Sequence, residues 1–197
     1  DEAQRRVLDG VGALAAERVQ LADAAGLVLA EAVRSGVAVP PWTNSAMDGF
    51  AVRAADVAGA TREHPAVLRV LGEVPAGRAP DATVQPDTAL RIMTGAMVPP
   101  GADAVVPVED TDAPAGASAI PDAVAVFAPA RVGDHVRVAG SDVEAGAPVL
   151  PAGRACDPAA IALLAATGHG TVVVHRRPRV AVLSTGDELV PPGQALA

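Results

Sequence analysis

Four short loops in this sequence place a hydroxyl or a carboxylate beside a glycine, each directly after an apolar segment. Converging carboxylates suit Mg²⁺, a hard ion that takes one or two carboxylates together with water and phosphate oxygens. Hydroxyls and the backbone N–H groups of glycine turns suit an oxyanion. The side chains that could supply this chemistry are Asn44, Ser45 and Asp48 in the first loop, Thr94 in the second, Asp142 in the third, and Ser184, Thr185 and Glu188, with Gly186, in the fourth.

The first loop lies within residues 40–52 and contains the only tryptophan of the chain. Two prolines fix the backbone that enters it. The pairs Asn44–Ser45 and Asp48–Gly49 are typical of turns, and an apolar alternation follows them. We expect a tight loop that presents an acidic residue next to a glycine, where another backbone or a ligand can approach. Ordinary turn chemistry is an alternative explanation for each of the four loops.

Composition limits the classes of partner. Half of the 197 residues are hydrophobic but only 2% are aromatic, so the core must be built from aliphatic side chains. All 15 basic residues are arginine, and the net charge is −8. Binding to nucleic acid needs clustered cations, so this charge argues against a nucleic-acid partner.

Metal and nucleophile chemistry based on cysteine or histidine finds little support. Cys156 is the only cysteine, which excludes a disulfide framework and a cysteine-type zinc site within one chain. Cys156 precedes a predicted helix, but no histidine is placed to activate it, and the four histidines lack ligand spacing. No P-loop, dinucleotide-binding glycine pattern or HExxH motif is present. No signal peptide or membrane-spanning run is recognised, which favours a cytoplasmic location.

The first part of the chain is predicted to begin with a helix over residues 3–18. Val7, Leu8, Val11 and Leu14 recur at three- and four-residue spacing, although two glycines weaken the pattern. A further helical turn is expected at 21–25, and the chain then reads as extended over 27–39.

The middle of the chain is rich in predicted strands. Apolar segments at 67–74, 89–93, 104–108 and 124–127 are separated by glycine and proline, and Pro107 marks the third as an edge strand or a bulge. This spacing predicts a compact, barrel-like or curled β domain over 43–136.

The last part of the chain combines a helix with two strands. Asp157 is a good N-cap, Pro158 fits the first helical position and Gly168 lies just past the end. A strand is expected at 172–174. The continuous apolar run at 180–183 predicts a strand buried on both faces of a parallel sheet, where ligands bind beyond the carboxyl ends of strands. We therefore expect a further α/β domain to begin near residue 177.

These motifs together resemble the molybdopterin molybdenumtransferase family, the molybdenum-insertion enzymes that also include the E domain of gephyrin. The matching stretches follow the family's order: PWTNSAMDGFAV at 41–52, RIMTGA at 91–96, PGADAVV at 100–106, Glu109, VRVAGSDV at 136–143 and VAVLSTGDELVPPG at 180–193. The sequence departs at Trp42, where the family often has phenylalanine, and at Ser141, where acidic residues are common.

The resemblance implies an activity. Enzymes of this family insert molybdate into adenylylated molybdopterin with Mg²⁺, and they release AMP. The implied catalytic residues are Asp48, Thr94, Asp142 and Glu188, of which Asp48 and Glu188 would hold the metal. Residues implied to contact the cofactor or oxyanion are Asn44, Ser45, Arg137, Ser184, Thr185 and Gly186.

The resemblance also implies an α+β, multi-domain architecture. Residues 1–42 and 137–176 would form an elongated first domain, 43–136 an inserted β-rich second domain, and 177–197 the beginning of a truncated α/β domain. The family is dimeric, with an active site shared between subunits. Its members continue past residue 197 with the rest of the third domain and a fourth domain, which hold most of the pterin- and nucleotide-binding surface, so this chain would be inactive by itself. A non-catalytic scaffold of the gephyrin type and a paralogue that inserts tungsten are the alternatives.

Overall fold

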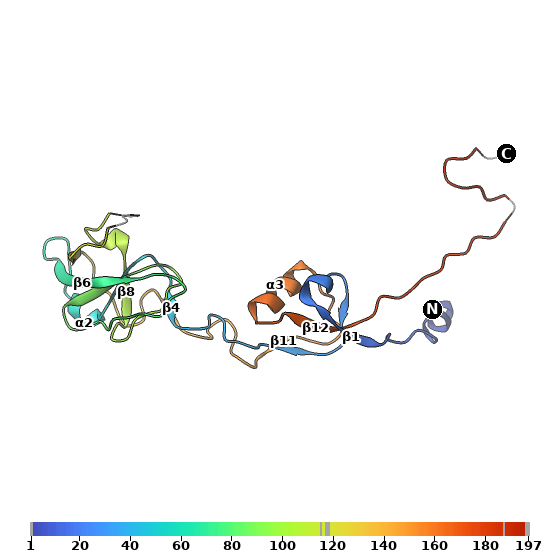
Figure 1. Cartoon of the computed structure of the whole chain (residues 1–197), viewed down its shortest axis with the longest axis horizontal. Coiled ribbons are helices and arrows are strands. Elements are labelled where there is room, and N and C mark those ends of the chain that lie inside the picture. The colour runs from blue at the N-terminus through green and yellow to red at the C-terminus, as the bar shows by residue number, and fades with distance from the viewer. Residues whose placement is uncertain (1, 115, 117–118, 187, 196–197) are drawn as a thin grey trace. The chain divides into compact units, whose positions relative to one another are not determined.

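The computed structural model describes residues 2–114, 116, 119–186 and 188–195 (Figure 1). The chain divides into two compact units. Unit 1 comprises Asp1–Val33, Leu150–Ala165 and His169–Ala197, and unit 2 comprises Arg34–Val149 and Ala166–Gly168. Unit 2 is therefore inserted into the sequence of unit 1.

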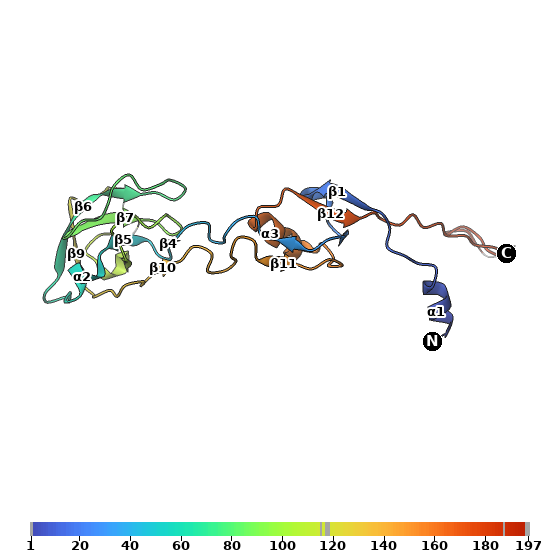
Figure 2. The ribbon, with the colours of Figure 1, turned by 90° about the horizontal axis from the view of Figure 1, so that it is seen from below.

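Unit 2 is built on a five-stranded sheet with the order β8-β5-β7-β6-β9. Figure 2 labels β5, β6, β7 and β9 of this sheet. Strands β6 and β7 are parallel, and the other neighbours are antiparallel. The sheet curls into a half-barrel. Its strands are β5 (Gly49–Val52), β6 (Ala66–Val74), β7 (Thr88–Ile92), β8 (Ala104–Pro107) and β9 (Ala123–Val126).

Strand β5 is buried along its whole length because the curled sheet has apolar clusters on both faces. Successive side chains of a strand point to opposite faces. Phe50 and Val52 accordingly belong to one cluster, with Leu68 and Val106, whereas Ala51 belongs to the other cluster, with Leu90 and Ile92. Apart from Phe50, aliphatic side chains fill both clusters, as the composition predicts.

Shorter elements complete unit 2. Helix α2 (Ala54–Val57) begins where the Ala54 N–H donates to Oδ1 of Asp103 at 2.7 Å. The 3₁₀ turn η2 (Val108–Asp110) follows β8 directly. Strand β4 (Asn44–Ser45) pairs with β10 (Val136–Arg137), which places Arg137 opposite Asn44.

Unit 1 contains a three-stranded antiparallel sheet and one longer helix. The strands are β1 (Ala16–Gln20), β12 (Thr171–His175) and β2 (Val28–Leu29), in the order β1-β12-β2. Helix α3 (Pro158–Ala166) packs Leu164 into a core with Leu29 and Val174. The remaining elements are α1 (Glu2–Leu8), η1 (Leu21–Asp23), β3 (Val33–Arg34) and β11 (Pro148–Leu150), and β3 pairs with β11.

Most of the predicted elements are confirmed. The strands expected at 67–74, 89–93, 104–108 and 124–127 are β6 to β9, and β8, which ends at Pro107, lies at an edge of the sheet. The capped helix after Asp157 and the strand at 172–174 are also present. The Ala160 N–H donates to Oδ1 of Asp157 at 2.8 Å, as an N-cap requires.

Two predicted elements differ from the structure. The helix expected over 3–18 ends at Leu8, and residues 16–20 form β1, which pairs with β12. The strand expected at 180–183 is not formed, and Val180, Val182 and Leu183 are 77–90% exposed. A strand needs a hydrogen-bonded neighbour, and no described residue pairs with this segment. None of the described helices is long and apolar enough to cross a membrane.

Candidate functional site

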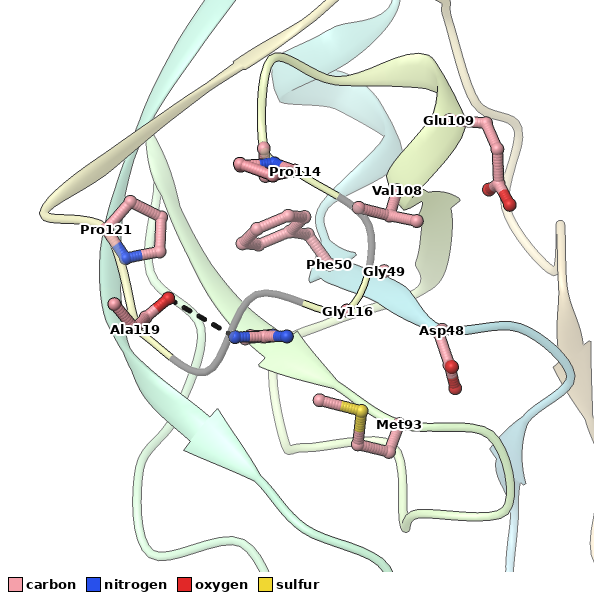
Figure 3. A pocket seen from close by; sticks show the side chains of 12 residues that line it. Asp48, Gly49, Phe50, Met93, Val108, Glu109, Pro114, Gly116, Ala119 and Pro121 are labelled. Carbon is pink, nitrogen blue, oxygen red and sulfur yellow. Dashed lines mark hydrogen bonds between the residues drawn. The ribbon is translucent and has the colours of Figure 1, made fainter.

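A cavity of about 620 Å³ lies in unit 2, between the sheet and the segment that follows η2 (Figure 3). Its wall is mostly apolar, and its described ionisable residues are Asp48, Arg91 and Glu109. Asp48 immediately precedes β5, and Glu109 lies in η2. The remaining lining residues are Gly49, Phe50, Met93, Val108, Ala113, Pro114, Gly116, Ala119 and Pro121.

Asp48 is held by Thr94. The backbone N–H and the hydroxyl of Thr94 both donate to Oδ1 of Asp48, each at 2.7 Å. Among the described residues, no hydrogen bond is made to Oδ2, so that oxygen is available to a ligand. Because the Thr94 hydroxyl proton points at Asp48, this hydroxyl offers a ligand only its lone pairs.

The Asp48 carboxylate is ionised at neutral pH. The backbone N–H of Thr94 lowers the pKa of Asp48 most, followed by the Thr94 hydroxyl; partial burial raises it and the nearby Arg91 charge lowers it. The net direction is downward. Hydrogen bonds donated to the charged form favour that form. The cavity is therefore lined by a fixed, negatively charged carboxylate that can bind a cation.

The two loops that carry Asp48 and Thr94 are hydrogen-bonded along their backbones. The Gly95 N–H donates to the Ser45 carbonyl at 2.8 Å, and the Ser45 N–H donates to the Ala96 carbonyl at 3.0 Å. The Trp42 indole N–H reaches the Gly95 carbonyl at 3.4 Å. These bonds explain why the 94–95 turn keeps its place beside Asp48.

Gly49 permits the close approach of β5 to β8 at this site. A Cβ atom at position 49 would lie 2.0 Å from the carbonyl oxygen of Val106, which is backbone and cannot move aside. The glycine after Asp48 is thus required by the sheet itself. The expectation that it leaves room for a neighbouring backbone is correct.

Asn44 and Ser45 form strand β4, which pairs with β10, and both residues are buried. The Ser45 hydroxyl donates to the Met47 carbonyl at 2.6 Å and accepts the Met47 N–H at 3.2 Å, so it stabilises its own turn. The Asn44 amide donates to the Trp42 carbonyl at 3.4 Å. Its Oδ1 is buried and has no donor among the described residues. Neither side chain lines the cavity.

Neither Arg137 nor Asp142 lines the cavity. Arg137 is opposite Asn44 in the β4–β10 pair, with its side chain exposed. The Asp142 N–H donates to the Val39 carbonyl at 2.9 Å, and its side chain is exposed. The roles assigned to these two residues stay predictions.

The fourth predicted loop belongs to unit 1, and its residues Ser184, Thr185, Gly186 and Glu188 are exposed. The Leu189 N–H donates to the Gly186 carbonyl at 3.1 Å. Asp187, in the same motif, lies outside the described residues. The convergence of this loop with Asp48, and its role in metal binding, therefore stay predictions.

Two ionisable residues of the cavity were absent from the predicted site. Arg91 is the single charged residue of β7, whose other four residues are buried. Glu109 was recognised only as part of a family motif. A lone arginine in an otherwise apolar strand, three residues before Thr94, is a signal that could have identified the first of them.

The described residues contain no group of three or more His, Cys, Asp or Glu side chains that could hold a metal ion. Mg²⁺ does not require such a group, since it is commonly bound by one or two carboxylates with water and substrate phosphates. The available Oδ2 of Asp48 fits this pattern. Within unit 2, Asp48 is thus a suitable single protein ligand.

A curled sheet with an ionised aspartate at an apolar cavity is typical of small-molecule-binding proteins of mixed α/β structure. The family model of the MoeA N-terminal region (domain I and II) matches residues 1–168. The chain belongs to the MoeA family.

Curated relatives of the chain are named molybdopterin molybdenumtransferase. The chain is 47% identical over 195 residues to molybdopterin molybdenumtransferase 2 of Mycobacterium tuberculosis (strain H37Rv). The matched region covers 99% of this chain and 47% of the relative. The chain is 38% identical over 191 residues to molybdopterin molybdenumtransferase of Bacillus subtilis (strain 168), covering 96% and 44%. The chain thus spans about half the length of these relatives.

Solved structures agree with the sequence comparison. The crystal structure of the molybdopterin biosynthesis moeA protein from Pyrococcus horikoshii OT3 superposes with a TM-score of 0.85 at 34% identity, covering 98% of this chain and 50% of that one. At 34% identity, this structural neighbour supports both the fold and the family membership of the chain. The sequence-based assignment to this family is confirmed.

Proposed function

We propose that this chain is the N-terminal part of a molybdopterin molybdenumtransferase, which inserts molybdate into adenylylated molybdopterin and releases AMP. The observation that carries the proposal is the ionised Asp48, fixed by two Thr94 donors beside a cavity, in a chain of the MoeA family. A scaffold has no need of a carboxylate held in this way.

Asp48 is proposed to bind Mg²⁺ through Oδ2, with Glu188 as the second carboxylate. When bound, Mg²⁺ would offset negative charge on the adenylyl phosphate and on the oxyanion. Thr94 favours the ionised form of the Asp48 carboxylate and fixes it in one orientation, which preorganises it for this task. Molybdate is the substrate, and we propose that hydroxyls such as that of Ser184 donate to its oxygens.

The remaining inferred properties belong to the same proposal. Asn44, Ser45, Arg137, Asp142, Thr185 and Gly186 would support or contact the cofactor. The inserted β-rich domain would span 43–136, and a further α/β domain would begin near 177. The protein would act in the cytoplasm as a homodimer whose active site combines Asp48 of one subunit with Glu188 of the other.

AMP release tests the proposal. The chain, expressed together with its native downstream residues, is supplied with adenylylated molybdopterin, Mg²⁺ and molybdate. We expect molybdate-dependent AMP release that Asp48→Asn abolishes while the melting temperature changes little. Asp81→Asn is the matched control, because Asp81 is exposed and does not line the cavity.

Two results would count against the proposal. A folded, dimeric protein that releases no AMP would favour the scaffold. Release that is unchanged in Asp48→Asn would remove this loop from the active site. Replacing molybdate by tungstate in the same assay tests the alternative of a tungsten-inserting enzyme.

A further inference from the structure

Arg91 is the only described basic residue that lines the cavity. It lies in β7, and its side chain is partly buried. Its neighbours Leu90 and Ile92 are buried in the apolar cluster that also contains Ala51. One guanidinium nitrogen, Nη1, donates to the Ala119 carbonyl at 3.3 Å, the bond drawn in Figure 3. A guanidinium has five N–H donors, so this bond leaves most of its donors for a ligand.

The other ionisable residues of the cavity are acidic. Asp48 and Glu109 contribute two negative charges, and Arg91 contributes one positive charge, so the described side chains sum to −1. A phosphate alone would meet net repulsion here. A divalent cation on Asp48 would turn the sum to +1, and the cavity would then attract a phosphate.

We propose that Arg91 is a further substrate-binding residue: its guanidinium binds the phosphate of the nucleotide-bearing substrate in this cavity, together with a divalent cation on Asp48. This inference rests on the proposed function and deepens it. Arginine suits the task because its planar fork matches two phosphate oxygens, whereas lysine offers a point charge. Met93 and Val108 also line the cavity, and their apolar side chains can contact the organic part of such a substrate.

A competing explanation is that Arg91 only balances the charge of Asp48. The two explanations differ in what they predict for ligands. A charge-balancing arginine would respond equally to adenosine and to AMP, whereas a phosphate-binding arginine would respond to AMP alone, and only when a divalent cation is present.

The direct experiment follows the Nε–Hε resonance of Arg91 by NMR in this 197-residue chain. The probes are AMP and adenosine, each with Mg²⁺ and with EDTA. We expect a saturable shift of the Arg91 resonance with AMP and Mg²⁺, and none with adenosine or with AMP in EDTA. Affinity for AMP should fall about tenfold or more in Arg91→Met, and less in Arg91→Lys.

Arg69→Met is the matched control. Arg69 lies on the neighbouring strand β6, is exposed and does not line the cavity, so this variant removes the same charge from the same sheet. Equal AMP affinity in the wild type and in Arg91→Met would overturn the proposal, and so would an equal loss in Arg69→Met. If Arg91→Met fails to fold, the wild-type resonance still decides the question.

The same variants separate this inference from the proposed function. In the longer protein, Arg91→Met should raise the KM for adenylylated molybdopterin more than it lowers kcat. AMP release with an unchanged KM would overturn the role of Arg91 and leave the activity standing. Phosphate binding at Arg91 without any AMP release would support the anion site and remove the insertion activity.

Discussion

Thr94 directs its backbone N–H and its hydroxyl to the same oxygen of Asp48, Oδ1, at 2.7 Å in both cases. The two residues are 46 positions apart in the sequence. The two oxygens of this carboxylate therefore have different roles. Oδ1 accepts both hydrogen bonds from Thr94, whereas Oδ2 accepts none from the described residues and is available to a ligand in the cavity that Asp48 lines.

Replacing Thr94 by valine should impair activity far more than stability. Valine keeps the shape and the backbone donor, but it removes the hydroxyl donor to Asp48. Because Asp48 is exposed, the melting temperature should change little, while AMP release falls about tenfold or more. Thr94→Ser restores a hydroxyl and should recover most of the activity. A valine variant with wild-type turnover would contradict the positioning role.

The pH dependence of Asp48 follows from the direction of its pKa. The Thr94 donors lower the folded-state pKa below the unfolded value of about 4. The ionised carboxylate therefore stabilises the fold above pH 4, and this contribution is lost as the pH falls through the lower, folded-state pKa. Thr94→Val should move that pKa upward. A carboxyl ¹³C titration of Asp48 in both proteins measures the shift, and an unchanged or lower pKa in the variant would refute this account.

Gly49→Ala should destabilise unit 2. Its methyl group would lie 2.0 Å from the Val106 carbonyl oxygen, so β5 and β8 must separate. Overpacking of this kind costs about 1–3 kcal/mol or more in the free energy of unfolding. Gly59→Ala is the control, because nothing lies within 4 Å of a Cβ at that position. Urea denaturation of the two variants should give clearly different midpoints.

Asp157 should contribute to unit 1 as a helix cap. Asp157→Ala removes the acceptor of the Ala160 N–H at the start of α3, and the loss of such a cap costs about 1 kcal/mol. Asp157→Asn keeps an acceptor and should cost much less, although it also gives up the ion pair with Arg154. Equal destabilisation by alanine and asparagine would assign the effect to the ion pair.

Cys156 should react slowly with thiol reagents in the folded protein. It is 1% exposed, and burial, with a smaller contribution from Asp157, raises the pKa of its thiol. Both effects reduce the accessible thiolate. Labelling by an aromatic disulfide at pH 8 should be slow in buffer and complete in denaturant. Rapid labelling of the native chain would show that the core around α3 opens readily.

The strands and the capped helix could be predicted from the sequence because their signals are local. Alternation, proline and glycine mark β6 to β9, and Asp157 with Pro158 marks the start of α3. The error at 16–20 has a different origin. Gln20 pairs with Thr171, a partner far along the chain, and local periodicity carries no information about that partner.

The candidate site was predictable in part for the same reason. The loop motifs identified Asp48 and Thr94 as residues suited to chemistry. They could not show that both Thr94 donors meet one oxygen, because this depends on the backbone ladder between the two loops. Arg91 was not predicted because it lies inside an apolar strand, whereas the predicted site was built from polar loops.

The insertion of unit 2 between the two halves of unit 1 has a kinetic consequence. The β1–β12 ladder joins residues on either side of the inserted unit, and closing so long an unstructured loop costs conformational entropy. Folded unit 2 holds its own ends together, since the Ser35 N–H donates to the Ala147 carbonyl at 2.9 Å. Once unit 2 has folded, unit 1 closes a short loop instead of a long one. We therefore expect unit 2 to fold first and so to bring the two segments of unit 1 together.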